Sequence, residues 1–86
     1  MVRHSPQVMW DVVDGVTVVC DIETGEIFEM NPTAALIWTL CGDQYEVDGI
    51  VERVQMVYPN EEPSRIRRDV EEALQLLMRH GIVQDH

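Results

Sequence analysis

Asn31 and Pro32 divide the chain into two halves with different hydrophobic patterns. Before them, apolar residues alternate with polar ones or form short β-branched runs, as in half-buried strands. After them, apolar residues recur every three to four positions, as on one face of a helix. Asparagine is a favoured N-cap and proline suits the first helical turn, so a helix should begin at this boundary. The pattern predicts an α+β fold in which a sheet precedes the helices.

The first half predicts three antiparallel strands that are joined by tight turns. The expected strands are Val8–Val13, Val16–Ile22 and Ile27–Met30. Asp14-Gly15 is a strong hairpin signal, and Gly25 tolerates the positive φ of a second turn. We therefore expect a meander in which Ile27–Met30 lies at one edge.

The second half predicts three helices, at Pro32–Leu40, Asp48–Tyr58 and Pro63–His80. The last helix has the clearest core stripe, which consists of Ile66, Val70, Leu74 and Leu77. Gly81 should end it. Three strands followed by three short helices make a winged-helix-like architecture. We expect a single domain over residues 1–86, ordered from about Val8 to Val83.

Composition excludes several classes of function. The chain has 86 residues, enough for one core, and a net charge of −10, which disfavours binding to nucleic acid phosphates. Neither cysteine has a metal-binding spacing, no histidine has a second ligand at a helical spacing, and no nucleotide-binding motif is present. We therefore expect no metal, no cofactor and no catalytic residues. No signal segment or membrane-length apolar run occurs, and two unpaired thiols suit a reducing cytoplasm.

The edge strand Ile27–Met30 is a candidate binding element. It consists of Ile27, Phe28, Glu29 and Met30, with one charge and no lysine or proline. An apolar edge of this kind is suited to accept a further strand through its main chain. The alternative is that the last helix simply packs over it.

The last helix has an apolar flank beside its core stripe, and this flank could form the second wall of a groove. Two choices of residues remain open, because the sequence does not orient the helix. The first choice consists of Asp69, Ala73, Leu76 and Leu77. The competing choice consists of Leu74 and Met78.

Two other functions are compatible with this pattern. A winged-helix DNA-binding regulator would use the arginine cluster Arg65, Arg67 and Arg68. Acidic residues follow four positions after each of these arginines, however, which predicts a salt-bridged surface instead of a basic face. The third function is an oligomerisation module that pairs its own edge strands.

Residues 21–38, DIETGEIFEMNPTAALIW, resemble the PqqD-like family, and so does the final segment DVEEALQLLMRHGI at residues 69–82. The resemblance implies a recognition element for ribosomally made, post-translationally modified peptides. Such domains bind the leader segment of a precursor as an added strand, between the third strand and the third helix. A stand-alone chain resembles the leader-binding protein of lasso-peptide pathways, which works with a separate leader peptidase and a cyclase. Two departures from the family pattern are Met30, where leucine is usual, and Ala73, where phenylalanine is common.

Overall fold

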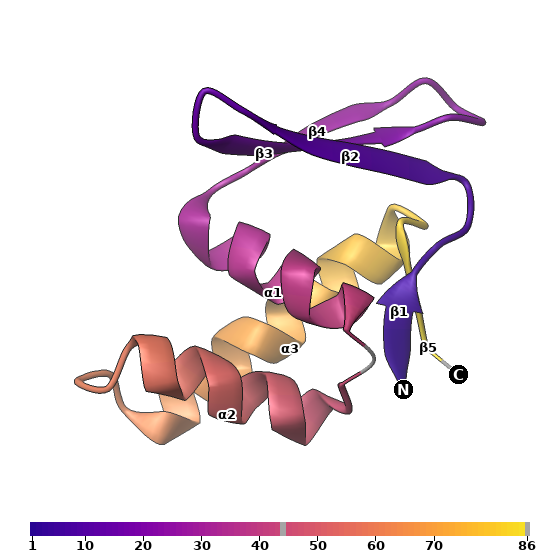
Figure 1. Ribbon diagram of the computed structural model, residues 1–86. Coiled ribbons are helices and arrows are strands. Elements are labelled where there is room, and N and C mark those ends of the chain that lie inside the picture. Colours follow the sequence, from indigo (N-terminus) through magenta and orange to yellow (C-terminus); the bar gives the residue numbers. More distant parts are fainter. Residues whose placement is uncertain (44, 86) are drawn as a thin grey trace.

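The computed structural model describes residues 1–43 and 45–85, so that Gln44 and His86 lie outside the described part of the chain. A three-stranded sheet covers one side of a layer of helices, and a separate pair of short strands lies beside the helices (Figure 1). The sheet lies over α1, while α2 lies on the far side of α1 from the sheet. The predicted α+β, winged-helix-like class is confirmed.

The sheet is the predicted meander. Its strands are β2 (Val8–Val13), β3 (Val16–Asp21) and β4 (Ile27–Met30), antiparallel in the order β2-β3-β4. Asp14 and Gly15 both have positive φ, 52° and 79°, as a two-residue turn of type I′ requires. β4 is therefore at an edge, as expected.

The helices also follow the predicted order. They are α1 (Pro32–Gly42), α2 (Val47–Val57) and α3 (Pro63–Arg79). The Asn31 side chain caps α1 by accepting a hydrogen bond from the Ala34 amide at 2.8 Å. Gly81, at φ 74°, ends α3, because its own amide bonds to Met78 O and the Ile82 amide bonds to Leu77 O. These two bonds form a Schellman motif, which turns the chain back toward the core.

Two short strands at the ends of the chain were not predicted. β1 (Val2–His4) and β5 (Val83–Asp85) pair antiparallel, so regular structure extends beyond the expected ordered range of Val8 to Val83. Val2 and Val83 are buried, and the Ser5 amide bonds to Ile82 O at 3.0 Å. Three-residue strands carry too little periodicity to be recognised in a sequence, and their stability comes from this tertiary packing.

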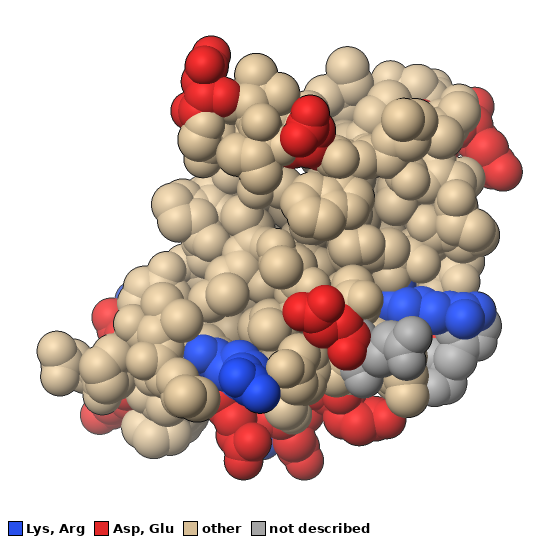
Figure 2. All heavy atoms as spheres, viewed as in Figure 1, with Lys and Arg blue, Asp and Glu red and all other residues tan. Residues whose placement is uncertain are grey.

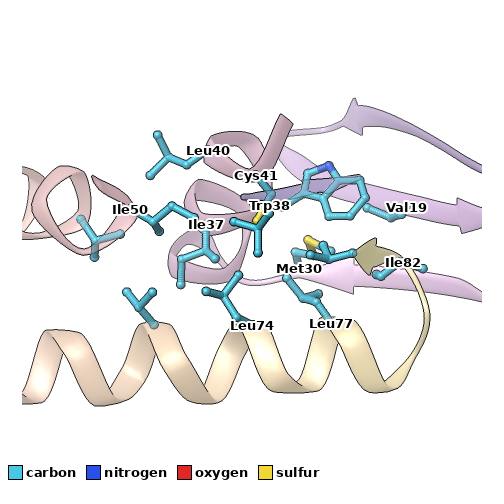
Figure 3. Packing of buried hydrophobic residues seen from close by; sticks show 14 of the residues in the cluster. Val19, Met30, Ile37, Trp38, Leu40, Cys41, Ile50, Leu74, Leu77 and Ile82 are labelled. Carbon is cyan, nitrogen blue, oxygen red and sulfur yellow. The ribbon is translucent and has the colours of Figure 1, made fainter. Parts of the chain in front are cut away.

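The buried apolar residues form one cluster between the sheet and the three helices. The predicted stripe of α3 is buried in it: Leu74 and Leu77 point from α3 toward Ile37 and Met30 (Figure 3). Trp38 of α1 is fully buried at the centre. Since the stripe is used for the core, only the flanks of α3 remain available to a ligand.

Candidate functional site

The outer edge of β4 is open. Within the described residues β4 pairs only with β3, and the Ile27 side chain is 68% exposed. The Asp21 amide donates to Glu26 O, and peptide groups alternate in direction along an antiparallel pair. The N–H and C=O groups of Ile27 and Glu29 therefore point away from β3. The last helix, α3, does not cover this edge, in contrast to the alternative considered from the sequence.

The orientation of α3, which the sequence left open, follows from contacts on both of its flanks. On one flank the His80 ring lies 5.0 Å from the Phe28 ring of β4. On the other, Arg67 is 3.0 Å from Asp48 of α2, and Met78 lines a hollow together with Val47. At 100° per residue, the flank that faces β4 contains Asp69, Ala73, Leu76 and His80.

The residues of the first choice thus lie beside the open edge, and the competing residues do not. Leu76 is 50% exposed and Ala73 is half-buried, so both are accessible on the flank of α3 that faces β4, the second wall of the expected groove. Leu77 is buried at the base of the groove. Leu74 is buried in the core, and Met78 lies on the opposite flank.

The side chains of the four β4 residues point alternately to the two faces of the sheet. Phe28 and Met30 point toward the helices, and Met30 is buried. Ile27 and Glu29 point to the opposite face of the sheet and are exposed. Phe28 can therefore contact a ligand in the groove with its side chain, while Ile27 and Glu29 offer their main chain.

A bracket of hydrogen bonds from Gln7 joins the β3–β4 hairpin to the end of α3. The Gln7 side-chain amide donates to Gly81 O at 2.9 Å, at the end of α3, and to Asp21 at 3.4 Å. Asp21 is buried, and its other carboxylate oxygen accepts from the amides of Glu23 and Thr24 in the turn before β4. Gln7 and Asp21 thus connect the turn before β4 to Gly81 at the end of α3.

A pocket of about 120 Å³ lies between the start of α1, the end of α2 and the first half of α3. Its lining residues are Thr33, Val54, Tyr58, Glu61, Arg65, Ile66, Asp69 and Val70. The hydroxyls of Thr33 and Tyr58 are 3.2 Å apart. Asp69 belongs both to this pocket and to the flank of α3 that faces β4. The sequence did not single out this contact, because Thr33 and Tyr58 are 25 positions apart and no local pattern joins them.

The described residues contain no group of three or more histidine, cysteine or acidic side chains placed to hold a metal ion. Burial raises the pKa of the Cys41 thiol to about 12, which removes its thiolate at neutral pH. Among the described helices none is long and apolar enough to cross a membrane.

The fold and the open edge define a class of protein. It is a small winged-helix-like domain in which the open sheet edge, β4, lies beside the last helix, α3. Within this class the chain belongs to the PqqD family, whose model, described as coenzyme PQQ synthesis protein D, matches residues 16–83. This confirms the resemblance noted in the sequence. Two departures noted there lie at the groove: Met30 at its base and Ala73 on its wall.

Two solved structures share the fold over nearly the whole chain. One is described as TbiB1 in complex with the TbiA(beta) leader peptide, at 20% identity and a TM-score of 0.89, over 98% of this chain and 96% of that one. The other is lasso peptide synthetase B1 complexed with the leader peptide, at 24% identity and a TM-score of 0.87, over 98% of both chains. A search of curated protein sequences finds no match.

Proposed function

We propose that the chain is a non-catalytic, cytoplasmic adaptor that binds the leader segment of a ribosomally made precursor peptide and presents it to modifying enzymes. The observation that carries the proposal is the open edge of β4 beside an accessible apolar flank of α3. Membership of the PqqD family supports it, and so do the two structural neighbours, both of which are complexes with leader peptides. The same neighbours favour the lasso-peptide type of pathway.

In the proposed complex the leader adds a fourth strand next to β4. Its main chain pairs with the outward N–H and C=O groups of Ile27 and Glu29, which gives affinity without dependence on sequence. Every second side chain of the leader then points into the groove, against Phe28, Ala73 and Leu76. These contacts select apolar side chains, and Asp69 at the end of the groove favours a polar or basic one.

The test is a calorimetric titration with a synthetic leader peptide encoded beside the domain. Leu76→Asp should weaken binding about tenfold or more, because a carboxylate would lose its hydration against the apolar leader side chain. Met56→Asp is the matched control: Met56 is 71% exposed on α2, away from the groove, and its replacement should leave the affinity unchanged.

Phe28→Asp extends the test to the other wall of the groove and should also weaken binding. Circular dichroism of each variant separates lost binding from lost fold. Unchanged leader affinity in folded Leu76→Asp and Phe28→Asp variants would contradict the groove. Absence of binding to any neighbouring leader, with the parent domain folded, would overturn the adaptor function itself.

We further propose that the separate modifying enzyme, such as a leader peptidase or cyclase, docks on the sheet face that points away from the helices. Strand alternation assigns eight side chains to this outer face, and only two are charged. They are Met9, Asp11, Val13, Val16, Val18, Cys20, Ile27 and Glu29. Met9, Val13 and Ile27 are each more than half exposed. A solvent-facing sheet side this apolar is typical of an interaction surface.

Docking on the outer face is tested by Met9→Lys. This variant should bind leader normally, because Met9 lies on β2 and points away from the groove. It should lose binding to the purified modifying enzyme, measured by surface plasmon resonance. If Met9→Lys and Val13→Lys both bind the enzyme normally, the outer face is not the docking site.

The DNA-binding alternative gains no support. Arg67, one of its three arginines, lies 3.0 Å from Asp48 and 3.8 Å from Glu71, so its charge is neutralised. The other two expected pairs, Arg65–Asp69 and Arg68–Glu72, do not form ion pairs in the part of the chain that the structure describes. With a net charge of −10, two exposed arginines do not make a basic face.

A further inference from the structure

Two arginines at the start of α3 carry charge that is not neutralised by an ion pair. Arg65 and Arg68 are exposed, and neither forms an ion pair with any residue in the described part of the chain. They line a hollow of about 400 Å³, whose other lining residues are Glu62 and Ser64. We call this the arginine hollow. Two guanidinium groups share it with one carboxylate, so the hollow has an excess of positive charge.

The arginine hollow is an exception on a strongly acidic molecule. The net charge is −10, and only six residues are basic. On the face drawn in Figure 2, acidic side chains lie at the sheet end and gather along the lower edge at the helical end. An acidic ligand is therefore repelled by most of the surface and attracted at this hollow. Two arginines are too few to bind a nucleic acid, but they suffice to hold one carboxylate.

β4 and α3 run in opposite directions, which places the arginine hollow beyond the end of β4. The Phe28 ring near the start of β4 lies 5.0 Å from the His80 ring at the end of α3. Three residues past the end of β4, Thr33 lines a pocket together with Asp69 and Arg65 of α3. In Figure 1, α3 begins next to α2 and ends toward the sheet. A strand that pairs with β4 and continues past its end therefore approaches Arg65.

Arg65 projects from the flank of α3 that faces β4. At 100° per residue it lies within about 20° of Leu76 around the helix axis. The two residues are about 16 Å apart along the axis, which is the length of about five residues of an extended strand. Arg68 follows almost one turn later and points about 60° further toward solvent, so it lines the same hollow from the outer side.

We propose that the arginine hollow binds one aspartate or glutamate side chain of the leader peptide and thereby fixes the register of the added strand. The inference rests on the proposed adaptor function and names the chemistry of one further leader position. Main-chain pairing with β4 is equally good after a slip of two residues, because alternate leader side chains still face α3. A carboxylate held by two guanidinium groups removes this freedom, since a slip would move it by about 7 Å.

Two acidic residues restrict where the leader carboxylate can bind. Asp69 lies between Leu76 and Arg65 on the same flank of α3. Glu72 is exposed about one turn after Arg68. A leader carboxylate closer to Leu76 meets these negative charges, whereas one that reaches the arginine hollow is attracted. We therefore expect the acidic leader residue about five positions from the leader residue that contacts Leu76.

The experiment is a calorimetric titration of the full chain with the synthetic leader peptide encoded beside it, in about 50 mM salt. Arg65→Glu combined with Arg68→Glu should weaken the affinity about fivefold or more, since two attractive charges become repulsive. This double variant should fold, because acidic side chains are favourable in the first turns of a helix, and circular dichroism checks it.

Arg79→Glu is the matched control for the double variant. Arg79 is also exposed on α3 and forms no ion pair with a described residue. It lies about 20 Å from Arg65 along the helix, which is more than a Debye length at this salt concentration. The same charge reversal at this position should therefore leave the leader affinity nearly unchanged.

A charge swap identifies the leader residue. Each aspartate and glutamate of the leader is replaced by lysine in turn. At one position, with the expected spacing, lysine should weaken binding to the parent domain and restore binding to the double variant. A nitroxide label on the leader reports the register. It should broaden one set of β4 amide signals in the parent complex, and also a second set, two residues away, in the double variant.

Three results would overturn the inference: unchanged affinity in the folded double variant, an equal loss of affinity in Arg79→Glu, or no lysine substitution that restores binding. The adaptor function survives each of these results if the parent domain binds leader and Leu76→Asp does not. Absence of leader binding by the folded parent domain would contradict the adaptor function, and the register contact would fall with it. The two failures are therefore distinguishable.

Discussion

At the scale of single residues, an aromatic stack holds the first strand to the centre of the fold. The His4 ring is stacked on the Trp38 ring at 3.7 Å, and His4 Nε2 is 2.6 Å from Trp38 O. Trp10 meets Trp38 edge-on at 6.3 Å. Gly42 lies so close that a Cβ there would be 2.8 Å from the His4 ring. The Trp38 indole thereby joins β1, β2 and α1.

Trp38→Ala should therefore be the most damaging single change in the core. Trp38 is fully buried, and we expect a loss of about 3–5 kcal/mol in the free energy of unfolding, typical of a large-to-small aromatic substitution. Trp10→Ala is the control, because Trp10 is 44% exposed and its loss should cost less. Urea unfolding followed by circular dichroism measures both variants. An equal or larger cost for Trp10→Ala would mean that the stack does not centre on Trp38.

The two cysteines should differ in reactivity. Burial raises the pKa of Cys41 to about 12, so at pH 8 almost no thiolate is present to react. Cys20 is partly exposed on the outer face of the sheet. Ellman's reagent should modify Cys20 in the native protein and Cys41 only after unfolding in urea. Equal rates for the two native thiols would show that the core opens around α1.

At the scale of elements, the groove depends on the bracket between the β3–β4 hairpin and the end of α3. Asp21→Ala removes the acceptor of two turn amides and should cost about 1–3 kcal/mol of stability. It should also weaken leader binding, since β4 would no longer be held at a fixed distance from Gly81. Asp11→Ala, on the exposed face of β2, is the control and should change neither quantity. A destabilised Asp21→Ala variant with full leader affinity would mean that the bracket stabilises the fold without shaping the groove.

The elements themselves could be predicted because their signals are local. Asp14-Gly15 specifies a turn with positive φ, Asn31-Pro32 starts α1, and Gly81 ends α3, each through the backbone conformation of one or two residues. The open edge of β4 was also foreseen, since the spacing of the strands implies a meander. The role of Ile27–Met30 in peptide binding stays a prediction.

Long-range geometry could not be read from these signals. The flank of α3 that faces β4 depends on the contacts His80–Phe28 and Arg67–Asp48, which join residues far apart in the sequence. The core stripe of α3 correctly placed Leu74 in the interior, but it did not tell whether the flank with Leu76 or the flank with Met78 faces β4. The pairing of β1 with β5 could not be predicted for the same reason, because it joins the two ends of the chain.

At the scale of the whole molecule, the net negative charge opposes self-association through the apolar outer face of the sheet. The outer face of the sheet could pair with a second copy, and so could the open edge of β4, which is the oligomerisation function considered from the sequence. A net charge of −10 on each copy opposes this at neutral pH. A partner with basic groups around an apolar surface avoids the repulsion. The negative charge thus favours a different protein over a second copy of the same chain.

This balance predicts association that depends on pH. Lowering the pH toward the isoelectric point of about 4.4 protonates carboxylates and removes the repulsion, so the protein should be a monomer at pH 7.5 and self-associate near pH 4.5. Sedimentation velocity at fixed ionic strength measures this, with circular dichroism to confirm that the fold persists. Met9→Arg should abolish the association by placing a charge on the outer face, whereas Met56→Arg adds the same charge on α2 and should not. A stable dimer at pH 7.5 that Met9→Arg dissociates would mean that a second copy, and not a modifying enzyme, occupies the outer face.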